Sequence, residues 1–176
     1  GGARDSVSAS RSSTGWSAGG FACKRKTSLD SPTISSYRLG FEGSSKIMNS
    51  YSDIRVLVVD DEPAIRDSLT AFLDDYGFDA MSCGSTEEAR DLMMENSFHV
   101  CVVDLRLPGL SGEDLILLAN KRFPEQRYII HTGSISYNLP EELRAIGMRR
   151  EHVFHKPVRV LSLLVKCIKE LAEQPA

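Results

Sequence analysis

The run Val100-Cys-Val-Val-Asp104 decides how this sequence folds, because four apolar residues end abruptly in a carboxylate. The segment Leu105–Gly109 follows, and its proline and glycine are typical of a loop. A buried strand that leads into such a loop would place Asp104 at the carboxyl edge of a sheet, where open α/β folds bind ligands. Aspartate is also a common turn former, so this residue alone does not distinguish a structural role from a chemical one.

The sequence on both sides of this run alternates between strand and helix patterns. Apolar, strand-like runs cover residues 54–59, 78–83, 100–104, 127–131 and 152–155. Apolar residues at helical spacing follow each run, over residues 63–77, from 85, over 112–123 and 139–147, and from 161. Such alternation with short connections predicts a parallel sheet covered by helices on both faces. The near-continuous apolar strands fit a sheet that is buried on both sides.

Polar residues follow four of these strands at their carboxyl ends. Asp60 and Asp61 follow the first strand, Asp104 the third, Thr132 the fourth and Lys156 the fifth. Three carboxylates at one sheet edge repel one another, and a hard cation such as Mg²⁺, which prefers oxygen ligands and phosphate, relieves that repulsion. With an ammonium and a hydroxyl beside them, the pattern predicts a phosphoryl site in which one carboxylate is the nucleophile.

Each of these residues also has a plainer interpretation when it is taken alone. Asp60 or Asp61 could cap the helix that starts at Pro63. Thr132 could be a turn hydroxyl, and Lys156 a solvated surface charge. The histidines do not show the spacing of a metal site: His99, His131, His152 and His155.

The composition favours a soluble globular protein, with 41% hydrophobic and 26% charged residues. No apolar run approaches the roughly 20 residues of a membrane span. The four cysteines are widely spaced and form no CxxC pair, which favours reduced thiols in a cytoplasmic protein over a zinc or disulfide framework. They are Cys23, Cys83, Cys101 and Cys167.

The charge is unevenly distributed along the chain. Residues 1–47 are rich in Ser and Gly and carry seven basic and three acidic residues, or +4, which leaves −7 for the remainder of a chain whose net charge is −3. We expect residues 1–47 to be disordered. They are a leader, a tag, an organellar transit peptide or sequence upstream of a start at Met48. The acidic remainder argues against direct nucleic-acid binding.

The sequence resembles the receiver domain of two-component response regulators over about residues 52–173. The motifs that carry the resemblance are Asp60-Asp61, Asp104 with Pro108-Gly109, Thr132-Gly133 and Lys156-Pro157. It implies an α/β, flavodoxin-like, doubly wound five-stranded parallel sheet with five helices. The implied strand order is 2-1-3-4-5, as in the chemotaxis member of that family.

The resemblance also implies the chemistry of the acidic residues. Asp104 would be the phosphoacceptor and take a phosphoryl group from the phosphohistidine of a histidine kinase. Asp60, Asp61, Asp104 and the backbone carbonyl of Arg106 would hold Mg²⁺ or Mn²⁺.

Thr132 and Lys156 would hold the phosphoryl oxygens, and Thr132 would swing inward upon phosphorylation. The Lys156–Pro157 bond is expected to be cis. The family often has an aromatic residue three positions before the lysine, where this chain has Val153, while Phe154 should face the other side of the sheet.

These inferences predict a cytoplasmic signalling switch that is operated by phosphorylation and is not a turnover enzyme. Its partners would be a sensor histidine kinase or phosphotransfer protein and a downstream protein or output domain, with no membrane and no direct nucleic-acid contact. The alternatives are a receiver fragment of a larger DNA-binding or hybrid regulator, a Mg²⁺-dependent phosphohydrolase with an aspartyl nucleophile, and a pseudo-receiver. Arg106 occupies the place where such a phosphohydrolase usually has a second acid.

The last helix has two apolar strips. Leu161, Val165 and Ile168 share one face, and a second strip is formed by Val160, Leu163 and Cys167. A single buried face needs only one stripe. The second strip predicts a partner or homodimer surface on the face made by the fourth helix, fifth strand and fifth helix, unless the helix is simply buried more deeply.

Overall fold

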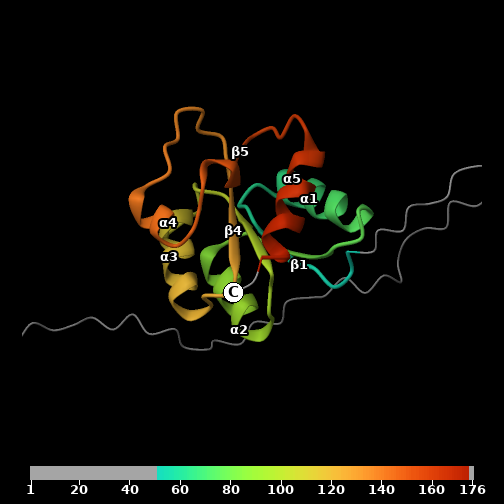
Figure 1. Cartoon of the computed structure of the whole chain (residues 1–176), viewed down its shortest axis with the longest axis horizontal. Coiled ribbons are helices and arrows are strands. Elements are labelled where there is room, and N and C mark those ends of the chain that lie inside the picture. Colours follow the sequence, from blue (N-terminus) through green and yellow to red (C-terminus); the bar gives the residue numbers. More distant parts are fainter. Residues whose placement is uncertain (1–50, 175–176) are drawn as a thin grey trace, which may run out of the picture.

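The computed structural model describes residues 51–174 (Figure 1). Three predictions concern residues outside this described part of the chain. They are the disorder of residues 1–47, the start at Met48 and the reduced thiol of Cys23. Within them, strands and helices alternate as predicted. The strands are β1 (Arg55–Val59), β2 (Asp79–Cys83), β3 (Val100–Val103), β4 (Arg127–Thr132) and β5 (Val153–His155). The helices are α1 (Pro63–Asp75), α2 (Thr86–Glu95), α3 (Gly112–Arg122), α4 (Glu141–Ala145) and α5 (Leu161–Ala172), with a 3₁₀ turn at Arg150–His152.

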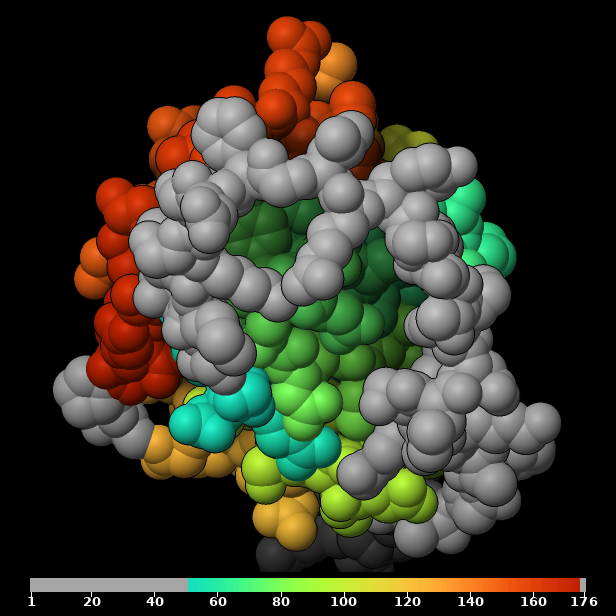
Figure 2. All heavy atoms as spheres, turned by 90° about the vertical axis from the view of Figure 1, so that its right-hand side faces the viewer, coloured from blue at the N-terminus to red at the C-terminus, as the bar shows by residue number. Residues whose placement is uncertain are grey.

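The five described strands form one sheet in the order β2-β1-β3-β4-β5, and every neighbouring pair is parallel. This confirms the predicted flavodoxin-like topology. Helices α1 and α5 cover one face of the sheet, and α2, α3 and α4 cover the other (Figure 1). Viewed from the side, the green surface of α1 and the red surface of α5 lie on the same side of the molecule (Figure 2).

Side-chain alternation along the strands divides the core into two layers. Val56 and Val58 pack with α1 and α5, whereas Leu57 and Val59 pack with α2, α3 and α4. All four are almost completely buried. At about 25 cal/mol per Å² of buried apolar surface, these two layers supply most of the driving force for folding.

Local signals explain where several helices begin and end. Pro63 occupies the first turn of α1, and Gly77, with φ of 89°, follows its end in a left-handed conformation that favours glycine. Ser85 and Ser111 cap α2 and α3, because each hydroxyl accepts a hydrogen bond from a backbone N–H in the first turn.

The last two helices differ from the sequence predictions. Helix α4 is shorter than predicted and spans only Glu141–Ala145. In α5, Leu161 was expected to be buried but is 36% exposed, whereas Cys167 was expected on the exposed strip but is buried. The thiol of Cys167 donates to the carbonyl of Glu151, which holds it under the 3₁₀ turn. Val160 and Leu163 remain exposed, so the second strip is smaller than predicted.

Two other expectations agree with the structure. The Lys156–Pro157 peptide bond is cis. Cys83, Cys101 and Cys167 are buried, and none of them forms a disulfide within residues 51–174. Within residues 51–174, the helices are all too short or too polar to traverse a bilayer.

Candidate functional site

The site lies at the carboxyl edge of the sheet, where the backbone ladder continues beyond the strands. The backbone N–H of Asp104 donates to Val59 at 2.8 Å, and that of Lys156 donates to Thr132 at 2.8 Å. The ladder therefore fixes the position at which each polar side chain leaves the sheet. Four polar side chains lie two residues beyond apolar side chains that pack in the α1/α5 layer, and so share that side of the sheet: Asp60, Asp104, His131 and Lys156.

Three carboxylates meet at this edge, as predicted. Oxygen atoms of Asp60, Asp61 and Asp104 lie within 4.8 Å of one another. Asp60 is 1% exposed and Asp104 3% exposed, whereas Asp61 faces solvent. Buried and exposed carboxylate oxygens in one cluster suit a hard divalent cation that keeps some of its water. These donors therefore fit the Mg²⁺ or Mn²⁺ that the sequence predicts.

Lys156 joins the acidic residues through its ammonium group. Its Nζ lies 2.7 Å from Asp104 Oδ2, 2.8 Å from Asp60 Oδ2 and 3.3 Å from Glu62 Oε1. Burial acts to lower the pKa of Lys156, but the carboxylates of Asp104 and Asp60 outweigh it and raise that pKa above its usual value. The side chain is therefore a permanent cation at neutral pH and not a solvated surface charge.

The two acids after β1 do not cap helix α1. Its N-cap residue is Glu62, and no side chain caps the helix there. Asp60 Oδ1 accepts a hydrogen bond from the Glu62 N–H at 3.0 Å, and the other oxygen faces Lys156. Burial raises the pKa of Asp60, although Lys156 and the Glu62 N–H act to lower it.

Thr132 ends β4, and Arg106 lies in the loop after Asp104. Thr132 is fully buried, and its hydroxyl accepts a hydrogen bond from the Ser134 N–H at 3.1 Å. Thr132 lies two residues beyond Ile130, which packs in the α2–α4 layer, so its side chain starts on that side of the sheet. The N–H of Arg106 donates to Asp104 Oδ1 at 3.3 Å, while its side chain is exposed.

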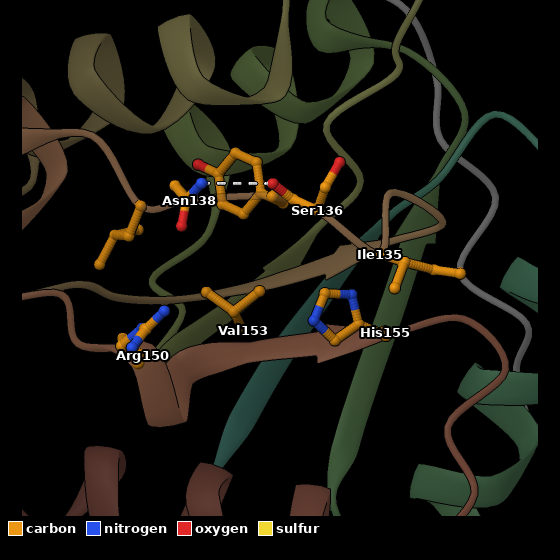
Figure 3. Close-up of a pocket in the computed structure, with 8 residues that line it drawn as sticks. Ile135, Ser136, Asn138, Arg150, Val153 and His155 are labelled. Carbon is orange, nitrogen blue, oxygen red and sulfur yellow. Dashed lines mark hydrogen bonds between the residues drawn. The ribbon is translucent and has the colours of Figure 1, made fainter.

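A polar cleft of about 310 Å³ lies next to β5 (Figure 3). Val153 and His155 line it from β5, and Ser136 and Asn138 line it from the loop before α4. Phe154 packs in the opposite layer, as predicted. The position where the family often has an aromatic ring is therefore occupied here by a small side chain beside open space.

The structure adds His131 to the site, although sequence spacing assigned it no role. Its imidazole is 7% exposed, and Nδ1 lies 3.8 Å from Asp60 Oδ2. It also lines a largely apolar cleft of about 560 Å³ between α1 and the connection from β5 to α5. Side chains alternate between the two faces of a sheet along each strand. His131 therefore faces the opposite side from its neighbour Thr132, which is the side of Asp60 and Lys156.

The chain is similar to several known proteins. PilR, a response regulator protein of Pseudomonas aeruginosa, is 39% identical over 71 residues, which is 40% of this chain and 16% of PilR. The regulatory protein VanRB of Enterococcus faecalis is 27% identical over 111 residues, which is 63% of this chain and 49% of VanRB. The match thus spans less than half the length of either relative.

Solved receiver domains share the fold. The Francisella response regulator 1452 receiver domain has a TM-score of 0.60 and 24% identity, over 68% of this chain and 97% of that one. The chemotaxis response regulator CheY4 of Vibrio cholerae has a TM-score of 0.58 and 22% identity, over 67% and 98%. A family model described as the response regulator receiver domain matches residues 56–168. Since this match covers more than half of the sequence, the chain belongs to the response regulator receiver domain family.

Proposed function

We propose that this domain is a phosphorylation-operated switch in which Asp104 accepts a phosphoryl group from the phosphohistidine of a histidine kinase or phosphotransfer protein. The observation that carries the proposal is the Lys156 ammonium, which lies within 2.8 Å of both Asp104 and Asp60 beside a three-carboxylate cluster. Phosphoryl transfer requires mainly positioning and neutralisation of charge. An acceptor carboxylate, an oxygen-rich cation site and a fixed ammonium supply both.

The other site residues have supporting roles in this proposal. Asp60, Asp61, Asp104 and the carbonyl of Arg106 would hold Mg²⁺ or Mn²⁺, which would supply positive charge beside the phosphoryl oxygens. Thr132 leaves its bond to the Ser134 N–H and turns its hydroxyl toward the phosphoryl group, which moves the loop before α4.

The phosphoacceptor is tested with a small phosphodonor such as acetyl phosphate in the presence of Mg²⁺. The wild type should gain one phosphoryl group by intact mass spectrometry, and Asp104→Asn should gain none, because an amide oxygen is not an effective nucleophile here. The matched control Asp91→Asn removes a carboxylate on α2, outside the cluster, and should be phosphorylated normally.

Other results would contradict the proposal. Continuous release of phosphate from a phosphomonoester would indicate a phosphohydrolase. A wild type that binds neither Mg²⁺ nor beryllofluoride, a phosphoryl mimic, would indicate a pseudo-receiver.

Receiver domains act as signalling switches, so a second protein or domain must read the state of Asp104. The matched relatives are longer regulators, among them the transcriptional regulatory protein HoxA of Cupriavidus necator, of which the match covers 16%. We infer that this domain controls either an output domain of a longer chain or a separate downstream protein. The buried thiols of the described residues, which form no disulfide with one another, fit a reducing cytoplasm.

We also propose that the face made by α4, β5 and α5 forms a homodimer in the phosphorylated state. Val160 is 51% and Leu163 55% exposed at the start of α5. With Mg²⁺ and beryllofluoride the wild type should dimerise in sedimentation experiments, and Leu163→Glu should weaken the dimer at least about tenfold, because a charge would be buried without a partner. Met94→Glu on α2, also an exposed apolar residue, is the control and should dimerise like the wild type. A wild type that stays monomeric at high concentration in both states would exclude the dimer.

A further inference from the structure

One peptide unit joins the two acids that follow β1, and it consists of the carbonyl of Asp60 and the N–H of Asp61. Because a peptide unit is planar, the direction of this carbonyl fixes the position of the Asp61 Cα. The sheet holds the near side of the unit, since the N–H of Asp60 donates to the carbonyl of Cys83 at 3.2 Å. The group that holds the Asp60 carbonyl therefore helps to decide where the exposed Asp61 carboxylate lies.

Arg66, one turn into α1, holds this carbonyl. Its Nη1 donates to the backbone oxygen of Asp60 at 2.8 Å. A hydrogen bond from a charged donor is stronger than one between neutral groups. The backbone N–H of Arg66 donates in turn to the carbonyl of Glu62 at 3.0 Å, within the first turn of the helix. The guanidinium thus ties the peptide between the two acids to the start of α1.

Gly84, directly after β2, leaves the space that this guanidinium occupies. A Cβ at Gly84 would lie 2.9 Å from Nη1 and 3.6 Å from Cζ of Arg66. The φ of Gly84 is not in the left-handed region that favours glycine, so the backbone there can accept an alanine. An added methyl group would meet the end of a flexible side chain and would displace the guanidinium without disrupting the fold.

We propose that Arg66 is a positioning residue for the cation site. Through the carbonyl of Asp60, its guanidinium fixes the Asp61 carboxylate in the cluster that Asp104 completes. Gly84 keeps the space for the guanidinium. This inference rests on the proposed function, because it concerns the cation that the function requires. Residues that orient metal ligands without touching the metal often change its affinity by about 10-fold to 100-fold.

Positioning and charge make opposite predictions for Arg66. A guanidinium repels a divalent cation, so removal of its charge alone would strengthen cation binding. Removal of the hydrogen bond frees the peptide between Asp60 and Asp61. The Asp61 carboxylate would then have to be ordered when the cation binds, and the entropy lost in that ordering would weaken binding. The sign of the change in affinity therefore distinguishes the two roles.

The first test measures Mg²⁺ affinity by isothermal titration calorimetry at neutral pH. Arg66→Met should bind Mg²⁺ about tenfold more weakly than the wild type. The control Arg90→Met removes another half-buried arginine, which pairs with Asp91 on α2 outside the cluster, and should stay within about twofold. Without divalent cations, the backbone amide signal of Asp61 in ¹⁵N–¹H NMR should shift in Arg66→Met and not in Arg90→Met.

The second test uses Gly84→Ala, which displaces the guanidinium and leaves every charge in place. This variant should bind Mg²⁺ about fivefold more weakly than the wild type. In the Arg66→Met background the same substitution should have no further effect, because the group with which the methyl collides is gone. Such non-additivity is expected of two residues that act through one contact. Gly84→Ala also decides the question if Arg66→Met does not fold, as circular dichroism would reveal.

The outcomes separate this inference from the proposed function. A wild type that does not bind Mg²⁺ contradicts the cation site of the proposed function itself. A wild type that binds it, with folded Arg66→Met binding equally well or more tightly, contradicts only the role of Arg66. A Gly84→Ala substitution that has no effect in the wild type, or the same effect in both backgrounds, contradicts the placing of the guanidinium as the link.

Discussion

Replacement of Gly112 by alanine should destabilise the domain by about 3–5 kcal/mol, because there is no room for one methyl group. A Cβ at this position would overlap the carbonyl oxygen of Asp104 and lie 2.9 Å from the Cα of Leu105. These are backbone atoms that cannot rotate away. The N–H of Gly112 also donates to the carbonyl of Leu105 at 3.1 Å, which holds the start of α3 against the loop that follows Asp104.

Urea denaturation monitored by circular dichroism measures this effect, and the chain offers a matched control. A Cβ at Gly133 would meet no atom within 4 Å, so Gly133→Ala should change the free energy of unfolding by no more than about 0.5 kcal/mol. A Gly112→Ala variant as stable as the wild type would contradict the close contact between the start of α3 and the loop after Asp104.

The same substitution should also disturb the site if enough protein folds. Relief of the overlap would require the Asp104–Leu105 backbone to move, and Asp104 Oδ2 lies only 2.7 Å from the Lys156 ammonium. Gly112 therefore links the packing of a helix to the position of the proposed phosphoacceptor. Its sequence context, a glycine within the first turn of a helix, gives no sign of this.

The sheet and its polar edge could be predicted from the sequence because both depend on strong local patterns. Uninterrupted apolar, valine-rich runs such as Val56–Val59 indicate a strand buried on both faces. An aspartate directly after such a run can lie only at the carboxyl edge of a parallel sheet. The meeting of Asp60, Asp61 and Asp104 thus followed from topology without any knowledge of side-chain contacts.

The remaining features depend on three-dimensional packing that spacing does not encode. Cys167 and Leu163 belong to one apolar strip, yet only Cys167 is covered, because the 3₁₀ turn folds over that end of α5. The spacing of the histidines along the sequence gives His131 no role, although its neighbour in space is the carboxylate that follows another strand. A systematic assignment of strand-end residues to one side of the sheet would have found that pair.

Replacement of Lys156 by methionine should cost about 3–5 kcal/mol of stability at pH 7.5 in the absence of divalent cations. Methionine matches the length of the side chain but leaves Asp60 and Asp104 as buried carboxylates without a cation, and loss of one partner from a buried ion pair has a cost of this size. The control Lys166→Met removes an exposed ammonium that pairs with Glu170 on the surface of α5, where the loss should be at most about 0.5 kcal/mol.

The pH dependence of the Lys156→Met defect follows from the direction of the Asp60 shift. Burial already raises the pKa of Asp60 above 3.8, and without Lys156 less would oppose that rise. A carboxyl group whose pKa is higher in the folded than in the unfolded state destabilises the fold only as pH rises above the unfolded value. The stability difference from the wild type should therefore be smaller at pH 5 than at pH 7.5 in urea titrations.

Mg²⁺ should reverse the defect at pH 7.5, because a cation bound by Asp60, Asp61 and Asp104 replaces the charge that the lysine supplied. Ligand that binds only the folded state stabilises it in proportion to the logarithm of its concentration. Millimolar Mg²⁺ should thus raise the urea midpoint of Lys156→Met more than that of the wild type, in which the ammonium competes with the cation for the same oxygens. An equal response would mean that Lys156 and the cation act on separate groups, and that the electrostatic balance inferred at this edge of the sheet is wrong.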